Sequence, residues 1–241
     1  MKKMVGSVLL SGALLLTVGA PLLAHAADTT ATADSENRAG TTSVKAHFDV
    51  DDMAVTPVDP SNPNKPSTDG NNHNGAKPGS GLSLIYVTDA LDFGSNKLSG
   101  TADQAFPVDV AKSTSLNKGM FVTEVSDNRG TAAGWKLAVT GDSLQGADKS
   151  TIKGASISLP AGTLGNSGAE KNGATTAAYT ISLDSKPATN NVLQAVKNNG
   201  TGVTVDTFDP ASIKLNIPAN TARNQDYATA LNWSLSDSPA S

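Results

Sequence analysis

The sequence predicts an all-β protein, an antiparallel β-sandwich of about nine or more strands with at most one short helix. From residue 82 onward, short runs rich in β-branched and aromatic residues alternate apolar with polar side chains. Clusters such as "DNRG", "GNSG" and "KNNG" separate these runs, and their glycine and asparagine residues suit tight turns between antiparallel strands.

Nine segments of the chain are strand candidates. They cover residues 82–87, 105–110, 120–125, 134–140, 155–159, 177–183, 203–208, 212–217 and 227–235. Only residues 189–199 have helical spacing, through Val192, Leu193 and Val196, so the one short helix that the prediction allows would lie there.

The first 81 residues differ in composition and pattern from the rest. Residues 1–26 resemble a signal peptide, with a basic start, an apolar run to Leu23 and small residues before a cleavage site after Ala26. An uncleaved anchor is less favoured because Pro21 and several glycines and serines interrupt the run. We expect a flexible segment over 27–42, strands belonging to the domain over 43–58, and a proline-, glycine- and asparagine-rich linker or long loop over 59–81. The main domain then covers 82–241.

Composition limits the partners and the compartment. The net charge is −4, from 18 basic and 22 acidic residues, which argues against nucleic acid and anionic lipid as partners. Beyond the first 26 residues no stretch approaches the roughly 20 apolar residues of a membrane span. The chain has no cysteine, which points to an exported bacterial protein without disulfides or an acylated cysteine. "LPAGT" at 159–163 has its glycine and threonine in the wrong order for a sortase signal, so no covalent anchor is expected.

The two tryptophans stand in the same three-residue frame. Trp135 precedes Leu137 and Trp233 precedes Leu235, and in a strand the two members of each frame share one face. The favoured interpretation places both tryptophans in the core, with each indole N–H bonded to a carbonyl. The alternative is a surface platform on which sugar rings stack.

Several motifs in order resemble the WxL-domain proteins found on the surfaces of low-GC Gram-positive bacteria. They are "YVTDALDFGS" (86–95), "VSDNRGTAAGWKL" (125–137), "IKGASISLPAG" (152–162) and "IKLNIPANTARNQDYATALNWSLSDSP" (213–239). The resemblance covers about residues 43–241 and implies a small member in which the wall-binding domain is nearly the whole protein. It also implies secretion, a cell-surface location, non-covalent anchoring to peptidoglycan in the cell wall, and association with other surface proteins of the same gene cluster.

The candidate binding residues are the two frames and the turn before the first of them. Besides Trp135, Leu137, Trp233 and Leu235, this set includes Asp127, Asn128 and Arg129. The Arg129 guanidinium could hold a peptide-stem carboxylate or a wall phosphate in a bidentate fork. The alternative is that Asp127 and Asn128 shape the turn and Arg129 pairs locally.

No enzyme is expected, and neither a cofactor nor a metal site. Two S-x-x-K matches, at 115–118 and 150–153, lie in strand-rich sequence without the helix that such serine–lysine enzymes require. His47 and His73 have no serine or cysteine context that suggests a nucleophile–base pair. A second class of function remains open: a pilin- or adhesin-like sandwich that binds a protein through an exposed edge strand, ignores the wall, and uses both tryptophans only as core.

Overall fold

The computed structural model describes residues 42–70, 72–168, 171–184 and 189–237. The expected signal peptide (1–26) and all but the last residue of the expected flexible segment (27–42) lie outside the described residues. The chain divides into two units, Met1–Asp49 and Val50–Ser241. In the first unit, the described residues 42–49 are exposed and contain no strand.

The second unit is all-β, as predicted. Its described part holds sixteen strands and one 3-10 turn at Pro210–Ser212. The strands are β1 (Val58–Asp59), β2 (Asn62–Pro66), β3 (Leu82–Val87), β4 (Gln104–Pro107), β5 (Phe121–Asp127), β6 (Trp135–Gly141), β7 (Gln145–Gly146), β8 (Ser156–Leu159), β9 (Thr163–Asn166), β10 (Thr175–Thr176), β11 (Tyr179–Ser182), β12 (Asn190–Ala195), β13 (Gly202–Phe208), β14 (Lys214–Ile217), β15 (Tyr227–Ala228) and β16 (Leu231–Ser236).

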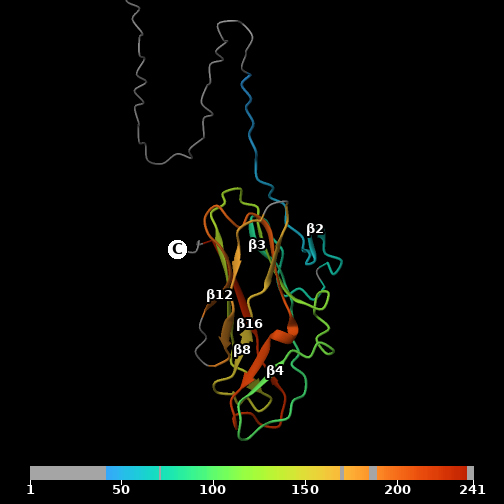
Figure 1. Cartoon of the computed structure of the whole chain (residues 1–241), viewed down its shortest axis with the longest axis vertical. Helices are drawn as coiled ribbons and strands as arrows, with labels where there is room; N and C mark the ends of the chain where they lie inside the picture. Colours follow the sequence, from blue (N-terminus) through green and yellow to red (C-terminus); the bar gives the residue numbers. More distant parts are fainter. Residues whose placement is uncertain (1–41, 71, 169–170, 185–188, 238–241) are drawn as a thin grey trace, which may run out of the picture. The chain divides into compact units, whose positions relative to one another are not determined.

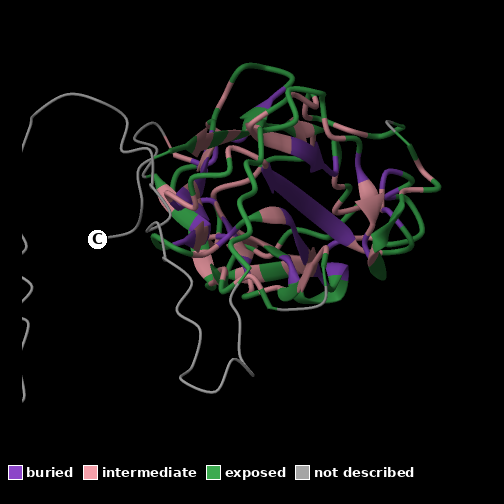
Figure 2. Ribbon diagram, turned by 90° about the horizontal axis from the view of Figure 1, so that it is seen from above, coloured by how far each residue is buried: buried purple, intermediate pink, exposed green. Residues whose placement is uncertain are grey.

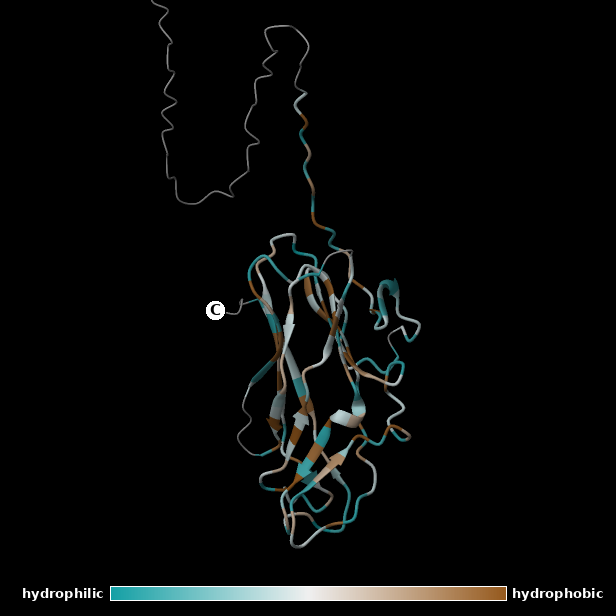
Figure 3. Cartoon of the chain, viewed as in Figure 1, coloured by the Kyte–Doolittle hydropathy of each residue, from teal (hydrophilic) through white to brown (hydrophobic). Residues whose placement is uncertain are grey.

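Three four-stranded antiparallel sheets make up the sandwich. Their strand orders are β10-β12-β6-β16, β3-β5-β13-β9 and β11-β8-β14-β4, and two short pairs, β1-β2 and β15-β7, complete the unit. In Figure 1, β8 and β4 lie below β3 and β12, so the third sheet extends the sandwich along its length. Hydropathy changes from residue to residue along many of the short strands, as the changes of colour in Figure 3 show. A sheet built from such strands has one apolar face, and packing the sheets together buries these faces.

The main core lies between the sheets. Figure 2 shows buried strand segments in the interior with exposed loops around them. The largest side chains of this cluster are Trp135, Phe121 and Phe208, together with leucine and isoleucine residues from β6, β8, β11 and β12. Strand β5 is buried along its whole length. A second, smaller cluster covers its other face, formed by Ile85, Tyr86, Val122, Val203 and Val205.

Residues 55–75 cover this second cluster. Val55 and Val58 pack against it, and the Val58 backbone N–H donates to Glu124 Oε2 at 2.8 Å. Lys118 Nζ forms a 2.6 Å ion pair with Asp59. Residues 59–81, expected as a linker or long loop, therefore contain the second strand of the β1-β2 hairpin and pack on the domain. The prediction of strands over 43–58 is wrong for all but the last residue, since only Val58 of this region lies in a strand, β1.

The prediction of at most one short helix is confirmed for the described residues, and the segment with helical spacing, 189–199, contains a strand instead. The residues form β12, which pairs with β6 on one side and β10 on the other. A register shift between Asn191 and Leu193 places the consecutive residues Val192 and Leu193 both in the core. At such a β-bulge two consecutive residues can both face the core. Two adjacent apolar residues in the sequence then look like part of a helical pattern. None of the helical structure in the described ranges is long and apolar enough to cross a membrane.

Candidate functional site

The two tryptophan frames lie on neighbouring strands. Strands β6 and β16 pair in antiparallel register, with Leu137 opposite Leu235 and Val139 opposite Trp233. The frames therefore run in opposite directions and meet at their leucines, while the two tryptophans lie on opposite sides of the leucine pair along the strands. The sequence allowed these strands to meet but did not require it.

Trp135 belongs to the interior. Its side chain has no exposed surface, and its indole Nε1–H donates to the Gly200 carbonyl at 3.0 Å. Gly200 has φ +78°, and a Cβ there would collide with the Trp135 ring and with Ala195. Leu137 is also completely buried. In this structure the first frame supports the sandwich and presents no side chain to a ligand.

Trp233 is only half-buried because β16 is the last strand of its sheet. Its ring lies 6.0 Å from the Phe121 ring, centroid to centroid, and packs against the main core. Leu231 and Leu235 share this face and are also half-buried, whereas Asn232 and Ser234 on the other face are exposed. The second frame therefore has accessible apolar surface that the first frame lacks.

The turn before the first frame is held by an ion pair. Arg129 Nε and an Arg129 terminal nitrogen donate to the two carboxylate oxygens of Asp127 at 2.9 and 2.8 Å. The same terminal nitrogen donates to the Gly134 carbonyl at 2.9 Å. Asp127 is almost completely buried, while Asn128 and Arg129 are half-buried, and the Asn128 backbone N–H donates to the Gly81 carbonyl. The bidentate fork is thus used within the turn, and the guanidinium already has its carboxylate.

Two further carboxyl groups are buried on β5 and β13. Burial raises the pKa of Glu124 to about 7 and the pKa of Asp206 to about 7. Glu124 Oε2 accepts from the Val58 N–H, and Asp206 Oδ2 accepts from Thr176 Oγ1 at 2.6 Å. The other oxygen of each carboxyl group has no hydrogen-bond partner within the described part of the chain. Both groups lie inside the domain and therefore affect its stability rather than a surface ligand.

The outer face of the third sheet is a polar surface that the sequence reasoning missed. Thr180, Ser158 and Lys214 stand in one cross-strand row. Ser182, Ser156 and Asn216 form the next row, and Asn216 Nδ2 donates to the hydroxyls of Ser158 and Ser156 at 2.8 and 3.3 Å. We call these six residues the serine–threonine face. Alternating serine and threonine in "SISL" and "YTIS" was the available signal.

Shallow hollows flank this face. One, of about 410 Å³, is lined by Ser158, Thr180 and Lys214 of the face together with the half-buried Tyr179. The other, of about 330 Å³, is lined by Asn216 together with Asp103 and Gln104 near β4. Short hydroxyl side chains beside an aromatic ring, an amide and one cation offer hydrogen bonds, apolar contact and charge to a flat polar ligand.

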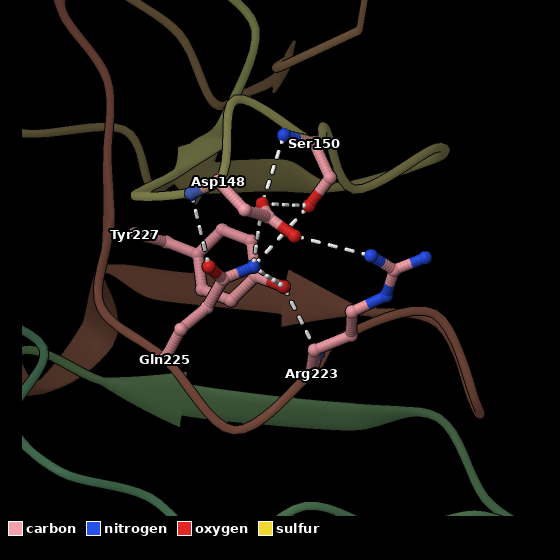
Figure 4. Close-up of polar contacts among 5 residues, drawn as sticks. All are labelled: Asp148, Ser150, Arg223, Gln225 and Tyr227. Atoms are coloured by element: carbon pink, nitrogen blue, oxygen red, sulfur yellow. Dashed lines mark hydrogen bonds and ion pairs between the residues drawn. The ribbon is translucent and has the colours of Figure 1, made fainter.

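A separate polar cluster joins two loops beyond the short β15-β7 pair (Figure 4). Asp148 accepts hydrogen bonds from Ser150, Gln225 and Arg223, and Gln225 Nε2 donates to the Tyr227 hydroxyl at 3.0 Å. These donors, the Ser150 hydroxyl first, lower the pKa of Asp148 below its ordinary range. The polar groups satisfy one another, so the cluster acts as a clamp between loops.

His73 lies near a serine and an aspartate without forming a catalytic relay. Ser115 Oγ is 3.4 Å from His73 Nδ1, and Asp89 Oδ1 is 4.0 Å from the same nitrogen. A serine–histidine–aspartate triad needs the serine and the acid on different ring nitrogens, so that the imidazole can pass the proton between them. The distances are also long for hydrogen bonds that would activate a nucleophile.

The fold and these surfaces define a β-sandwich domain held together by two neighbouring tryptophan-bearing strands. The chain belongs to the WxL family: a family model described as "WxL domain surface cell wall-binding" matches residues 35–239. The expected resemblance is thereby confirmed, and the protein is a cell-surface protein with a domain that binds the cell wall. Neither a comparison with curated proteins nor one with solved structures found a match.

Proposed function

We propose that the protein is secreted and binds the peptidoglycan of a Gram-positive wall without a covalent bond. The observation that carries the proposal is the family match over nearly the whole chain. Sugar polymers are bound by hydroxyl and amide groups beside apolar or aromatic surface. The serine–threonine face combines these features.

In this proposal the first frame and the wall contact are different parts of the domain. Trp135, Leu137 and the Asp127–Arg129 pair stabilise the sandwich, since the first two are buried and the pair is engaged internally. Lys214 is exposed at the β14 side of the serine–threonine face and has no acid opposite it in its cross-strand row. Its ammonium group suits a carboxylate of a wall peptide stem. Trp233, with Leu231 and Leu235, is the second candidate contact because it is half-exposed.

We also infer that the protein acts by binding and catalyses no reaction. The geometry around His73 supports this inference, because its two neighbours share one ring nitrogen. Association with other surface proteins remains part of the proposal. Each site on a wall is of modest affinity, and many neighbouring sites increase retention.

Co-sedimentation with purified peptidoglycan, freed of teichoic acid and protein, tests the proposal. We expect saturable pelleting of the wild type and a loss of about tenfold in affinity for Lys214→Glu, because the substitution reverses the charge at the face. Lys136→Glu is the matched control, since Lys136 lies on the outward side of β6 and carries the same charge.

Trp233→Ala separates the two candidate surfaces. Loss of pelleting in this variant, with the fold intact by circular dichroism and Lys214→Glu still pelleting, would assign the contact to β16 instead. Failure of the folded wild type to pellet would overturn direct wall binding. Equal loss in Lys214→Glu and Lys136→Glu would show a general charge effect and overturn the role of the face.

A further inference from the structure

The sandwich is closed along one side only. On that side β9 contacts β10, and Thr176 of β10 is hydrogen-bonded to Asp206 of β13. On the other side the two facing sheets end at β3 and β16. The outward edge of β3 is occupied, because Gly75 N–H donates to the Val87 carbonyl and Asn74 forms a bridge with Thr88. Along the outward edge of β16, no residue in the described ranges forms a strand pair.

This free edge carries an incompletely buried apolar row. Leu231, Trp233 and Leu235 face the core but remain half-buried, because β6 covers only one side of the strand. An open edge of six residues exposes N–H and C=O groups that can accept another strand. An added strand with apolar residues at alternate positions would cover this row and complete the side of the sandwich.

The same chain contains a segment of this character. In residues 43–50, "SVKAHFDV", Val44, Ala46, Phe48 and Val50 alternate with polar residues. Val44 is 82 % exposed, Phe48 89 % and Val50 52 %. The segment pairs with no other strand in the part of the chain that the structure describes. Such an alternating, exposed apolar row has the pattern of a half-buried strand without a partner.

We propose that residues 43–50 of one copy pair with the free edge of β16 in a second copy. The eight-residue segment is long enough to span the six residues of β16. One of its faces is apolar, as is the core-facing row of β16. Its other face carries Lys45, His47 and Asp49, which would lie beside the neutral Asn232, Ser234 and Ser236, so no like charges oppose each other.

The pairing is head-to-tail, since the donor segment and the acceptor strand are different parts of the chain. A pair formed in one direction leaves one acceptor free on the donating copy and one donor free on the accepting copy, so further copies can add at both ends and form open chains. The serine–threonine face lies on another sheet, so the proposal stands whether or not that face binds the wall. Linked copies would present several wall-binding surfaces at once and dissociate more slowly than single ones.

Light scattering after size-exclusion chromatography of the intact chain tests the pairing. We expect oligomers that grow with protein concentration, and a weakening of at least about tenfold for Phe48→Asp, which places a charge in the apolar row. His47→Asp is the matched control, because it adds the same side chain on the other face of the same segment. Both positions are exposed, so neither variant should affect folding.

Cysteine cross-linking locates the contact, and the absence of native cysteine makes it unambiguous. A His47→Cys copy mixed with a Ser234→Cys copy should give a mixed disulfide, whereas Lys153→Cys in place of Ser234→Cys should not. A wild type that stays monomeric at all concentrations overturns the proposal, as does an oligomer unchanged by Phe48→Asp. Equal cross-linking to position 153 would show random collision and also overturn it.

Discussion

Leu137 and Leu235 lie directly opposite each other across β6 and β16. Leu137 is completely buried, whereas Leu235 is half-buried on the edge strand. The two W-x-L frames therefore have different environments in the structure. Substitutions in the two frames should lower the free energy of unfolding by different amounts.

Leu137→Ala should lower the free energy of unfolding by about 3 kcal/mol, the usual cost of a cavity in a packed core. Leu235→Ala should cost less than about half of this, because water already reaches part of the side chain. Urea denaturation followed by circular dichroism measures both values. Equal losses would contradict the difference in burial between the two strands.

Gly200→Ala should destabilise the domain by at least about 2 kcal/mol, since the added methyl group meets the Trp135 ring and the backbone has positive φ. Trp135→Phe removes only the bond to the Gly200 carbonyl and some ring volume, and should cost about 2 kcal/mol. Thermal unfolding compares the two variants. Gly168→Ala is a control for backbone strain alone, because its φ is also positive but nothing lies near its Cβ position.

Arg129→Ala should be more harmful than a typical surface substitution. It leaves the buried Asp127 carboxylate without its two charge-assisted bonds, at a cost of about 2 kcal/mol or more. Arg129→Lys should recover only part of this loss because an ammonium group cannot form the bidentate fork. The midpoints of denaturant unfolding of the two variants test this prediction. A midpoint for Arg129→Ala equal to that of the wild type would show that the ion pair contributes nothing to stability.

Stability should fall as the pH rises from about 4 to about 7. Burial raises the pKa of Glu124 from 4.5 and of Asp206 from 3.8, both to about 7, so the folded state favours the protonated carboxyl groups. Their stabilising contribution is complete below the unfolded-state pKa values and is lost as the pH passes through the folded values. Each group contributes on the order of 3 kcal/mol to this change.

Unfolding free energies measured across that pH range test the sign. Asp206→Asn and Glu124→Gln replace the carboxyl groups by neutral groups of similar size, so each variant should show a flatter pH profile. A stability that increases over this range in the wild type, and equally in both variants, would show that these carboxyl groups do not control it.

Local patterns in the sequence predicted several strands well. Residues 203–208 largely alternate apolar and polar side chains and form most of β13, and the β-branched and aromatic run at 82–87 forms β3. Alternation reports the local backbone geometry, because successive strand residues point to opposite faces. The same local information failed at β12, where a bulge placed Val192 and Leu193 together in the core. It also missed β2, which contains two prolines and lies at a sheet edge.

The sequence by itself determined the all-β class, the positions of many strands and the family, since composition, period-two alternation and motif order are properties of the chain alone. Only the tertiary structure decided that the two frames are neighbours, that Trp135 is buried while Trp233 is half-exposed, and that Arg129 is already paired. The physical reason is that burial and pairing depend on which distant residues share a sheet. The same W-x-L frame is fully buried in a central strand and only half-buried in an edge strand.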